Sequence, residues 1–368
     1  MRTLLVTNDF PPRPGGIQAY CHALALRQPA GELVVYTSSW KGDAAFDAAQ
    51  GFPVVRDRSR VLLPTPRVVR AVSDVARAEG CDRVWFGATA PLAWMARQLP
   101  VERAVACTMG HELGWAALPG ARQALQRMAS QVDVLTCLSA FTRDRLAKVM
   151  PAEKLAMLPS GVDTDVFRPD AGGGAIRERH GLGSRPVIVC VSRLVRRKGQ
   201  DRLIKALSLV QQQIPDAALL LVGGGPLRPE LTSLTEQLGL SRDVVLTGGV
   251  PWDELPAHYA AGDVFAMPCH DRHRGLEVEG LGIVFLEAAA TGLPVVAGRS
   301  GGSPDTVQEG VTGHLVDGSS VQEVAARITG LLTDPVRAAR MGQAGRSWMQ
   351  ADWQWEAMAA RLRGLLAG

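Results

Sequence analysis

Short, continuously apolar segments alternate with segments of helical pattern along most of the chain, and this alternation constrains the fold more than any other feature. A strand whose residues are nearly all apolar is typical of a parallel sheet that helices cover on both faces. We therefore predict an α/β fold. The strands expected in the first half are Thr3–Thr7, Leu33–Thr37, Arg83–Phe86, Ala104–Thr108 and Val132–Leu138. Those expected in the second half are Val187–Val191, Ala218–Val222, Val244–Thr247, Val264–Met267 and Pro294–Ala297.

The segment after Leu158, PSGVDTDVFRPDAGGGAIRERHGLGSRP, is rich in Gly, Pro and Asp, as linkers are. A chain of 368 residues also suits two domains of roughly 100–200 residues each. We expect one domain over residues 1–170 and a second over 171–350, with a final helix, 353–366, that packs back near the first. Each domain is expected to be a doubly wound parallel sheet, which binds its ligand at the carboxyl ends of the strands.

Composition and charge exclude several classes of protein. Hydrophobic residues make up 46% and charged residues 21%, the balance of a globular chain rather than a disordered one. No apolar run reaches the roughly 18–20 residues that span a bilayer, and the apolar stretch at the N-terminus indicates a strand rather than a signal peptide. A net charge of +4 is too small to indicate nucleic acid as a partner. Six cysteines without a C-x-x-C pair indicate free thiols in a reducing cytoplasm.

Glycines and cations follow the predicted strands at positions that suit an anionic ligand. Gly15 and Gly16 lie between a strand and a helix, where free N–H groups favour an anion; an ordinary turn is the alternative. This turn lacks the G-x-G-x-x-G fingerprint, which argues against a nicotinamide dehydrogenase. The run SRLVRRKG contains Arg193 and Lys198, and its cations suit a diphosphate leaving group, whereas the alternative is a solvated basic loop. Gly224 follows the next strand and permits close approach of the backbone.

Two glutamates form the sharpest candidate site. Glu279 and Glu287 are eight residues apart, which on one continuous helix would separate them by about 12 Å. Gly280 and Gly282 indicate instead that Glu279 lies in a loop and Glu287 in a helix that begins near Gly282. The neighbours of Glu287 are apolar, so its carboxylate needs polar partners if it is buried, and sugar hydroxyls would serve. The alternative is a surface residue and a structural ion pair.

Three further groups are candidates for catalytic residues or metal ligands. His111 follows a predicted strand on the ligand side, although a structural histidine is the alternative. Asp163 and Asp165 have the D-x-D form of some metal sites but lack a second group of ligands. The sequence around Cys269 and His270 lacks a fourth ligand for tetrahedral zinc. We expect no metal site.

Taken together, these segments resemble the retaining glycosyltransferases of family 4, which have the GT-B fold of two Rossmann-like domains facing across a cleft. Arg193 and Lys198 match the Arg/Lys pair of that family, and Glu279 with Glu287 matches its E-x7-E motif. The segments VTNDFPPRPGGIQ, GHELGW, SRLVRRKGQD and EVEGLGIVFLEA also resemble the actinobacterial α-mannosyltransferases that act on phosphatidylinositol mannosides. The resemblance extends along essentially the whole chain.

The resemblance implies a role for each matching residue. Arg193 and Lys198 would bind the diphosphate of a nucleotide-sugar and stabilise its departure, and Glu287 would bind the ribose hydroxyls. Glu279 would contact the donor sugar, and His111 would lie beside it. The remaining donor contacts would come from Gly15, Gly16, Gly224 and the backbone N–H groups of Gly282, Ile283 and Val284. The family implies no obligatory cofactor or metal, and GDP-mannose is the favoured donor substrate.

The sequence constrains the identity of the acceptor and of the nucleotide base less than it constrains the transfer reaction. Met109 stands where the lipid-specific relatives carry a second histidine, and residues 270–274 are bulky where those relatives have a Gly-rich stretch. We expect a phosphatidylinositol mannoside acceptor at the inner face of the membrane. The whole basic surplus lies in residues 1–170, and the helix expected at Arg67–Glu79 would contact anionic lipid, unless it is an ordinary solvated helix. The alternatives are a soluble natural-product glycosyltransferase that uses a GDP- or UDP-sugar, and a nucleotide-sugar-binding protein without turnover.

Overall fold

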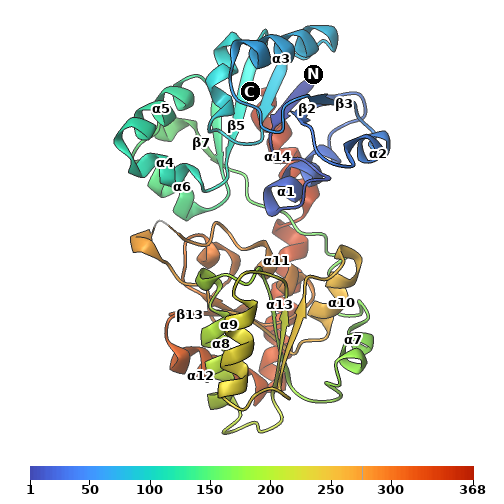
Figure 1. The fold of residues 1–368 in the computed structure, drawn as a ribbon, viewed down its shortest axis with the longest axis vertical. Helices are drawn as coiled ribbons and strands as arrows, with labels where there is room; N and C mark the ends of the chain where they lie inside the picture. Colours follow the sequence, from blue (N-terminus) through green and yellow to red (C-terminus); the bar gives the residue numbers. More distant parts are fainter. Residues whose placement is uncertain (276) are drawn as a thin grey trace. The chain divides into compact units, whose positions relative to one another are not determined.

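The computed structural model describes residues 1–275 and 277–368, and the chain divides into two compact units (Figure 1). Unit 1 comprises Met1–Ser160 and Trp355–Gly368, and unit 2 comprises Gly161–Gln354. In this division the first unit ends at Ser160, where we expected residue 170. The reason is local pairing, since the Val162 N–H donates to the Trp353 carbonyl and so attaches this part of the expected linker to unit 2.

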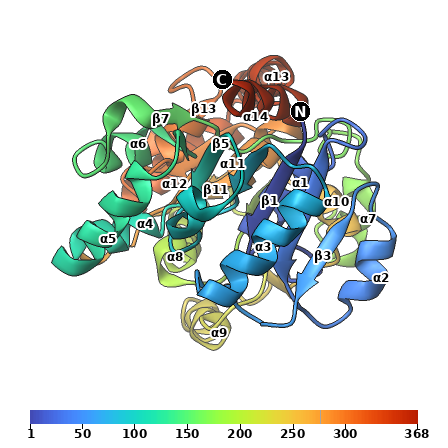
Figure 2. The same cartoon turned by 90° about the horizontal axis from the view of Figure 1, so that it is seen from above.

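Unit 1 is built on a parallel sheet of seven strands in the order β3-β2-β1-β4-β5-β6-β7. Every residue of β1 (Thr3–Thr7) and β2 (Leu33–Ser38) is buried, as expected for strands covered on both faces. Helices α3 and α14 lie on opposite sides of β1 and β5 (Figure 2). The other strands are β3 (Val54–Asp57), β4 (Arg83–Phe86), β5 (Arg103–Thr108), β6 (Val134–Cys137) and β7 (Leu155–Met157). The helices are α1 (Gly16–Ala25), α2 (Asp43–Ala48), α3 (Pro66–Ala78), α4 (Glu112–Ala117), α5 (Pro119–Ser130), α6 (Ala140–Leu146) and α14 (Trp355–Ala367), with 3-10 helices η1 (Leu92–Gln98) and η2 (Ala152–Lys154).

Unit 2 contains a second parallel sheet, of six strands in the order β10-β9-β8-β11-β12-β13. Its central strands are again buried along their whole length. The strands are β8 (Val187–Val191), β9 (Ala218–Val222), β10 (Val244–Gly248), β11 (Val264–Met267), β12 (Val295–Gly298) and β13 (Gly313–Val316). The helices are α7 (Gly173–Arg179), α8 (Gln200–Val210), α9 (Arg228–Gln237), α10 (Leu255–Ala260), α11 (Ile283–Ala290), α12 (Val321–Leu332) and α13 (Pro335–Asp352), with 3-10 helices η3 (Arg196–Lys198), η4 (Trp252–Glu254), η5 (His273–Gly275) and η6 (Ser303–Thr306).

The last helix, α14, completes the core of unit 1. Met358, Leu362 and Leu366 on one side of this helix are buried with Leu24 and Trp85 in one hydrophobic cluster. Arginine side chains of β4 and β5 donate to the last carbonyl groups of the helix. These bonds satisfy acceptors that a helix C-terminus leaves without an internal partner.

The two sheets confirm the expected α/β class, and their strand order determines where a ligand can bind. The order reverses between β1 and β4 in unit 1 and between β8 and β11 in unit 2. Doubly wound sheets bind their ligands at such reversals, beyond the carboxyl ends of the strands. The six cysteines are all buried and free. Among the residues that the structure describes, no helix is both long enough and apolar enough to cross a bilayer.

Candidate active site

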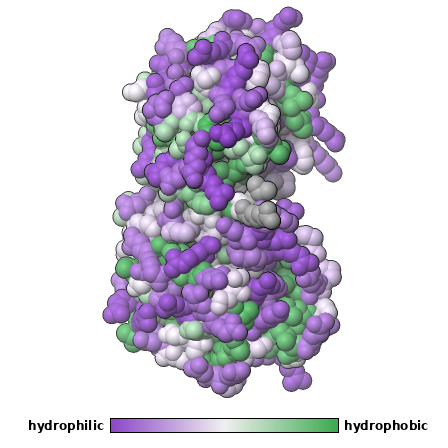
Figure 3. All heavy atoms as spheres, turned by 90° about the vertical axis from the view of Figure 1, so that its left-hand side faces the viewer, coloured by the Kyte–Doolittle hydropathy of each residue, from purple (hydrophilic) through white to green (hydrophobic). Residues whose placement is uncertain are grey.

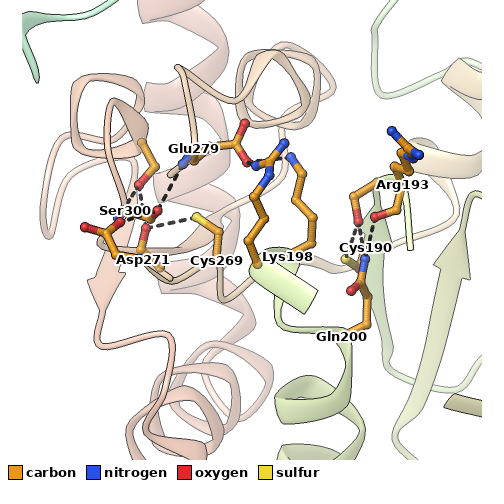
Figure 4. Close-up of polar contacts among 12 residues, drawn as sticks. Cys190, Arg193, Lys198, Gln200, Cys269, Asp271, Glu279 and Ser300 are labelled. Carbon is orange, nitrogen blue, oxygen red and sulfur yellow. Dashed lines mark hydrogen bonds and ion pairs between the residues drawn. The ribbon is translucent and has the colours of Figure 1, made fainter. Parts of the chain in front are cut away.

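The carboxylate of Glu279 is the centre of a charged cluster in unit 2. Its Oε2 atom lies 2.5 Å from Arg197 Nη1 and 2.6 Å from Lys198 Nζ. Both Glu279 and Lys198 are almost completely buried. Figure 4 shows the Glu279 and Lys198 side chains extending toward one another from different loops. A carboxylate between two cations satisfies charges that would otherwise be costly to bury.

The main chain of Glu279 is held as firmly as its side chain. Its N–H donates to Ser300 Oγ at 3.1 Å, and that hydroxyl donates to Asp271 Oδ1 at 2.6 Å (Figure 4). The Glu279 carbonyl accepts from the Gly302 N–H at 2.8 Å. A Cβ atom at Gly301, which has φ +51°, would lie 2.0 Å from that carbonyl oxygen, so only glycine fits beside it.

The charge state of Glu279 follows from its neighbours. Burial alone would raise the pKa of this carboxyl, but the charges of Lys198 and Arg197 outweigh burial and lower the pKa below its ordinary value. Glu279 is therefore ionised at neutral pH. The cluster consists of one negative and two positive groups, and its net positive charge suits an anionic ligand.

Arg193 and Gly224 lie near the same strand ends but outside this cluster. The Arg193 side chain is exposed and set apart from Lys198 (Figure 4), and no ion pair of its guanidinium occurs within residues 1–275 and 277–368. Its carbonyl accepts from Gln200 Nε2 at 3.0 Å, which fixes the loop. A Cβ at Gly224 would meet only one atom, at 3.7 Å, so packing does not require glycine there.

Glu287 is buried on α11 and does not contact the cluster. The Tyr259 hydroxyl, on α10, donates to Glu287 Oε2 at 2.5 Å. Burial raises the pKa of Glu287 to about 7, and the Tyr259 hydrogen bond acts in the opposite direction. Glu287 is therefore a carboxyl that changes charge near neutral pH. No hydrogen bond or ion pair joins it to Glu279 in the described part of the chain.

Helix α11 begins where the sequence indicated. Gly282 precedes the helix with φ +88°, and no side chain caps this end. The first N–H groups of a helix have no partner within it, so those of Ile283 and Val284 are suited to bind an anionic ligand. The expected arrangement, with Glu279 in a loop and Glu287 within a helix, is confirmed.

The glycine pair of unit 1 lies at the start of α1, directly beyond β1. Gly15 precedes the helix and has no side-chain cap, and a Cβ at Gly16 would meet nothing within 4 Å. Asp9 lies in the same loop, where its Oδ1 accepts from Gln18 Nε2 at 2.7 Å. Burial raises the pKa of Asp9, while the charges of Arg13 and His111 act to lower it.

His111 lies beyond β5, immediately before α4, and its side chain is 41% exposed. Its Nε2 atom is 3.3 Å from the Ala90 carbonyl oxygen and 3.3 Å from Glu112 Oε1. The contact with Ala90 has the direction of a hydrogen bond, whereas Glu112 Oε1 has no hydrogen-bond partner in the described part of the chain. His111 thus presents a fixed ring at the ligand end of the unit 1 sheet.

Asp163 and Cys269, which the sequence offers as candidate metal ligands, have other partners. Asp163 Oδ1 accepts from the N–H groups of Asp165 and Val166 at 3.0 and 3.1 Å and stabilises its own turn. The Cys269 thiol donates to the Gly298 carbonyl at 3.2 Å. Among the described residues, no three His, Cys, Asp or Glu side chains form a group that could hold a metal ion.

Comparison with known proteins assigns the chain to a family. The family model described as "Glycosyltransferase Family 4" matches residues 14–166, and the one described as "Glycosyl transferases group 1" matches residues 174–348. The chain is 51% identical to the GDP-mannose-dependent alpha-(1-6)-phosphatidylinositol monomannoside mannosyltransferase of Mycolicibacterium smegmatis, over 99% of this chain and 98% of that protein. This chain belongs to glycosyltransferase family 4.

A second relative of the glycosyltransferase is the GDP-mannose-dependent monoacylated alpha-(1-6)-phosphatidylinositol monomannoside mannosyltransferase of Corynebacterium glutamicum, at 44% identity over 99% of this chain and 97% of that protein. Among solved structures, Anabaena Alr3699/HepE in complex with UDP matches with a TM-score of 0.85 and 21% identity, covering 100% of both chains. At this identity the match shows the fold alone, and it agrees with the expected GT-B class.

The structure adds residues that sequence reasoning missed in this glycosyltransferase. Arg197 stands in the basic run already singled out, but only the fold shows that it shares Glu279 with Lys198. Tyr259, the partner of Glu287, is distant in sequence and carried no signal of its own. Glu112 follows His111 directly, and this adjacency was the one sign in the sequence of their contact.

Proposed function

We propose that this glycosyltransferase transfers mannose from GDP-mannose to a phosphatidylinositol monomannoside, forming an α-(1-6) linkage with retention of configuration. The observation that carries the proposal is the 51% identity to an enzyme of that name, which extends over 99% of this chain and so over both units. Identity restricted to unit 2 would have supported only a shared domain that binds a nucleotide-sugar.

The cations of unit 2 suit the diphosphate of the donor. Lys198 is buried and forms an ion pair with Glu279, and it would stabilise the negative charge that develops on the phosphate as the sugar leaves. The Arg193 guanidinium is exposed and would bind the diphosphate as a second cation. Glu279 would contact the mannose and would hold Lys198 in position before the donor binds.

The remaining donor contacts would come from the groups at the strand ends. The Glu287 carboxylate would accept hydrogen bonds from the ribose hydroxyls. The open N–H groups of Ile283 and Val284, which follow Gly282, would bind donor oxygens. Gly224 would let the backbone approach the nucleotide. In unit 1, Gly15 and Gly16 would approach the phosphates, and His111 would bind the mannose.

Calorimetric titration with GDP, UDP and GDP-mannose tests the donor. We expect GDP and GDP-mannose to bind more tightly than UDP, and a preference for UDP would overturn the donor assignment. Transfer is then measured with labelled GDP-mannose and vesicles that contain phosphatidylinositol monomannoside. Sensitivity of the labelled product to an α-mannosidase, with NMR of the new linkage, tests the proposed α-(1-6) bond.

We also propose that the enzyme contacts anionic membranes through the loop before α3. Val61 and Leu63 are exposed there, at 56% and 52%, and the exposed arginines Arg58 and Arg60 precede them in the sequence. This surface adjoins the helix expected to contact lipid, in which Arg67 is bound to Asp57 through two hydrogen bonds and Arg70 is exposed. The face that carries α4 to α6 is mostly hydrophilic, with apolar side chains in small groups (Figure 3).

Co-sedimentation with vesicles that contain phosphatidylinositol tests this contact. The pair Arg58→Gln with Arg60→Gln should weaken binding by about tenfold to thirtyfold, since each arginine near an anionic surface contributes about 1 kcal/mol. Substitution of two exposed arginines elsewhere, Arg97→Gln with Arg242→Gln, is the matched control. Equal losses in both double variants would indicate nonspecific charge attraction and contradict a defined surface.

A further inference from the structure

A buried carboxylate lies beside the one histidine of the candidate site. Glu112 is the first residue of α4 and is completely buried, whereas the side chain of its neighbour His111 is 41% exposed. The Met109 N–H donates to Glu112 Oε2 at 2.9 Å. The other oxygen, Oε1, is buried without a hydrogen-bond partner in the described part of the chain and lies 3.3 Å from His111 Nε2. Buried carboxylate oxygens without a donor are rare and call for a physical explanation.

The position of Nε2 determines which ring nitrogen of His111 carries the proton. Nε2 lies 3.3 Å from the Ala90 carbonyl oxygen and 3.3 Å from Glu112 Oε1, and a carbonyl or carboxylate oxygen can only accept. A nitrogen that faces two acceptors is stable only as N–H. A neutral imidazole carries a single proton, so Nδ1 is left with a free lone pair.

We infer that Glu112 is a positioning residue that holds His111 as the Nε2–H tautomer, so that Nδ1 accepts a hydrogen bond from a hydroxyl of the bound hexose. The part that concerns the hexose rests on the proposed function, whereas the tautomer belongs to the protein alone. The unpartnered Oε1 is explained by this role, because its negative potential favours a proton on the neighbouring Nε2.

Asp9 is the competing acceptor for a His111 proton. Its carboxyl interacts electrostatically with His111, but its Oδ1 atom already accepts from Gln18 Nε2 at 2.7 Å. If Asp9 rather than Glu112 fixed the ring, the proton would lie on Nδ1. The two arrangements therefore predict opposite tautomers, and a spectrum can distinguish them.

The tautomer is measured by long-range ¹H–¹⁵N NMR of protein labelled at its 7 histidines, without ligand. Spectra are recorded at rising pH until the His111 signal no longer changes, so that the tautomer of the neutral ring is read. His111→Gln assigns the signal. We expect a protonated Nε2 and an unprotonated Nδ1. A proton on Nδ1, alone or in addition to one on Nε2, overturns the inference.

Glu112→Gln tests whether the carboxylate sets the tautomer. The glutamine oxygen would keep the bond from the Met109 N–H and turn its NH₂ group toward His111 Nε2, so that Nε2 would face one donor and only the Ala90 carbonyl as an acceptor. We expect the Nδ1–H tautomer to appear in the spectrum and kcat to fall at least about tenfold, with KM for GDP-mannose nearly unchanged. An unchanged tautomer in this variant contradicts the inference.

Two controls separate the possible causes of a changed tautomer or rate in E112Q. The signal of His22, whose Nε2 is bound to Gln50 in the same unit, should not move in E112Q. Glu102→Gln, at an exposed glutamate of unit 1, makes the same change of charge and should leave both tautomer and rate unchanged. If E112Q does not fold, the wild-type spectrum still decides the tautomer. A correct tautomer without any mannosyl transfer would refute the proposed function and not the tautomer.

Discussion

Binding of GDP should release a proton from Glu287 at neutral pH. This carboxyl is buried and its pKa is raised to about 7, so about half of the molecules carry the proton at pH 7. Ribose hydroxyls that donate to the carboxylate favour its ionised form, and binding therefore drives the proton off. We expect about 0.5 proton released per GDP at pH 7, and less at pH 8.5, where the carboxyl is already ionised.

The same shift makes the stability of the protein depend on pH. Because the pKa of Glu287 in the folded protein lies above the ordinary value of 4.5, its contribution to the free energy of unfolding is complete below pH 4.5. This contribution is lost as the pH rises through 7. The difference between the two values corresponds to about 3 kcal/mol. Glu287→Gln resembles the protonated form at every pH. The variant should match wild type at about pH 4 and exceed it by about 3 kcal/mol at pH 8.5.

The assay is calorimetry of GDP binding at pH 7 in buffers of different ionisation enthalpy. The slope of observed enthalpy against buffer enthalpy gives the number of protons released. Titration of the GDP phosphates contributes equally to wild type and Glu287→Gln, so the difference between the two slopes isolates Glu287. Equal proton release by the two proteins would refute the ribose role. Equal pH dependence of their unfolding free energies would refute the raised pKa as well.

Three other substitutions test the remaining roles. Lys198→Ala should lower kcat by about 10²–10³ through loss of a cation on the leaving diphosphate; an effect on thermal unfolding alone would contradict this role. Arg197→Ala should remove one of the two cations that lower the pKa of Glu279. The free energy of unfolding of this variant should then be lower than that of wild type at pH 7, and the difference should shrink below about pH 4.5. A difference that does not depend on pH would argue against the lowered pKa of Glu279. His111→Ala should abolish transfer with unchanged GDP affinity by calorimetry, and normal turnover would exclude His111 from the reaction.

The central strands could be predicted from sequence, whereas three edge strands could not. Strands β1, β8 and β9 are buried at every residue, so each reads as a continuous apolar run. Strands β3 and β7 are only partly buried and have four and three residues, so they lack such a run. Strand β13 begins with glycine and contains a histidine, although all four residues are buried. Edge strands pair on one side only, which places weaker demands on their sequence.

Some features of the candidate site could likewise be predicted from the local sequence, whereas others depend on tertiary packing. The spacing of Glu279 and Glu287 around Gly282 is a local pattern, and it placed one carboxylate in a loop and the other in a helix. The sharing of Glu279 by Arg197 and Lys198 depends on how the loop before α11 packs against η3, which no local pattern encodes. A glutamate at the start of a helix, such as Glu112, ordinarily indicates a favourable charge at that helix end. Its complete burial is visible only in the fold.

In the proposed function, Glu279 has to satisfy two conditions that conflict unless the cluster can rearrange. Without donor, Lys198 is buried, and an unpaired ammonium there would be costly, so the carboxylate must hold it. With donor bound, the proposal needs the same ammonium on the diphosphate. The second cation would resolve the conflict, because Arg197 would keep Glu279 paired when Lys198 turned to the phosphate. The bonds from the Glu279 N–H to Ser300 and from the Gly302 N–H to the Glu279 carbonyl would keep the loop fixed meanwhile, so the change would require movement of side chains only.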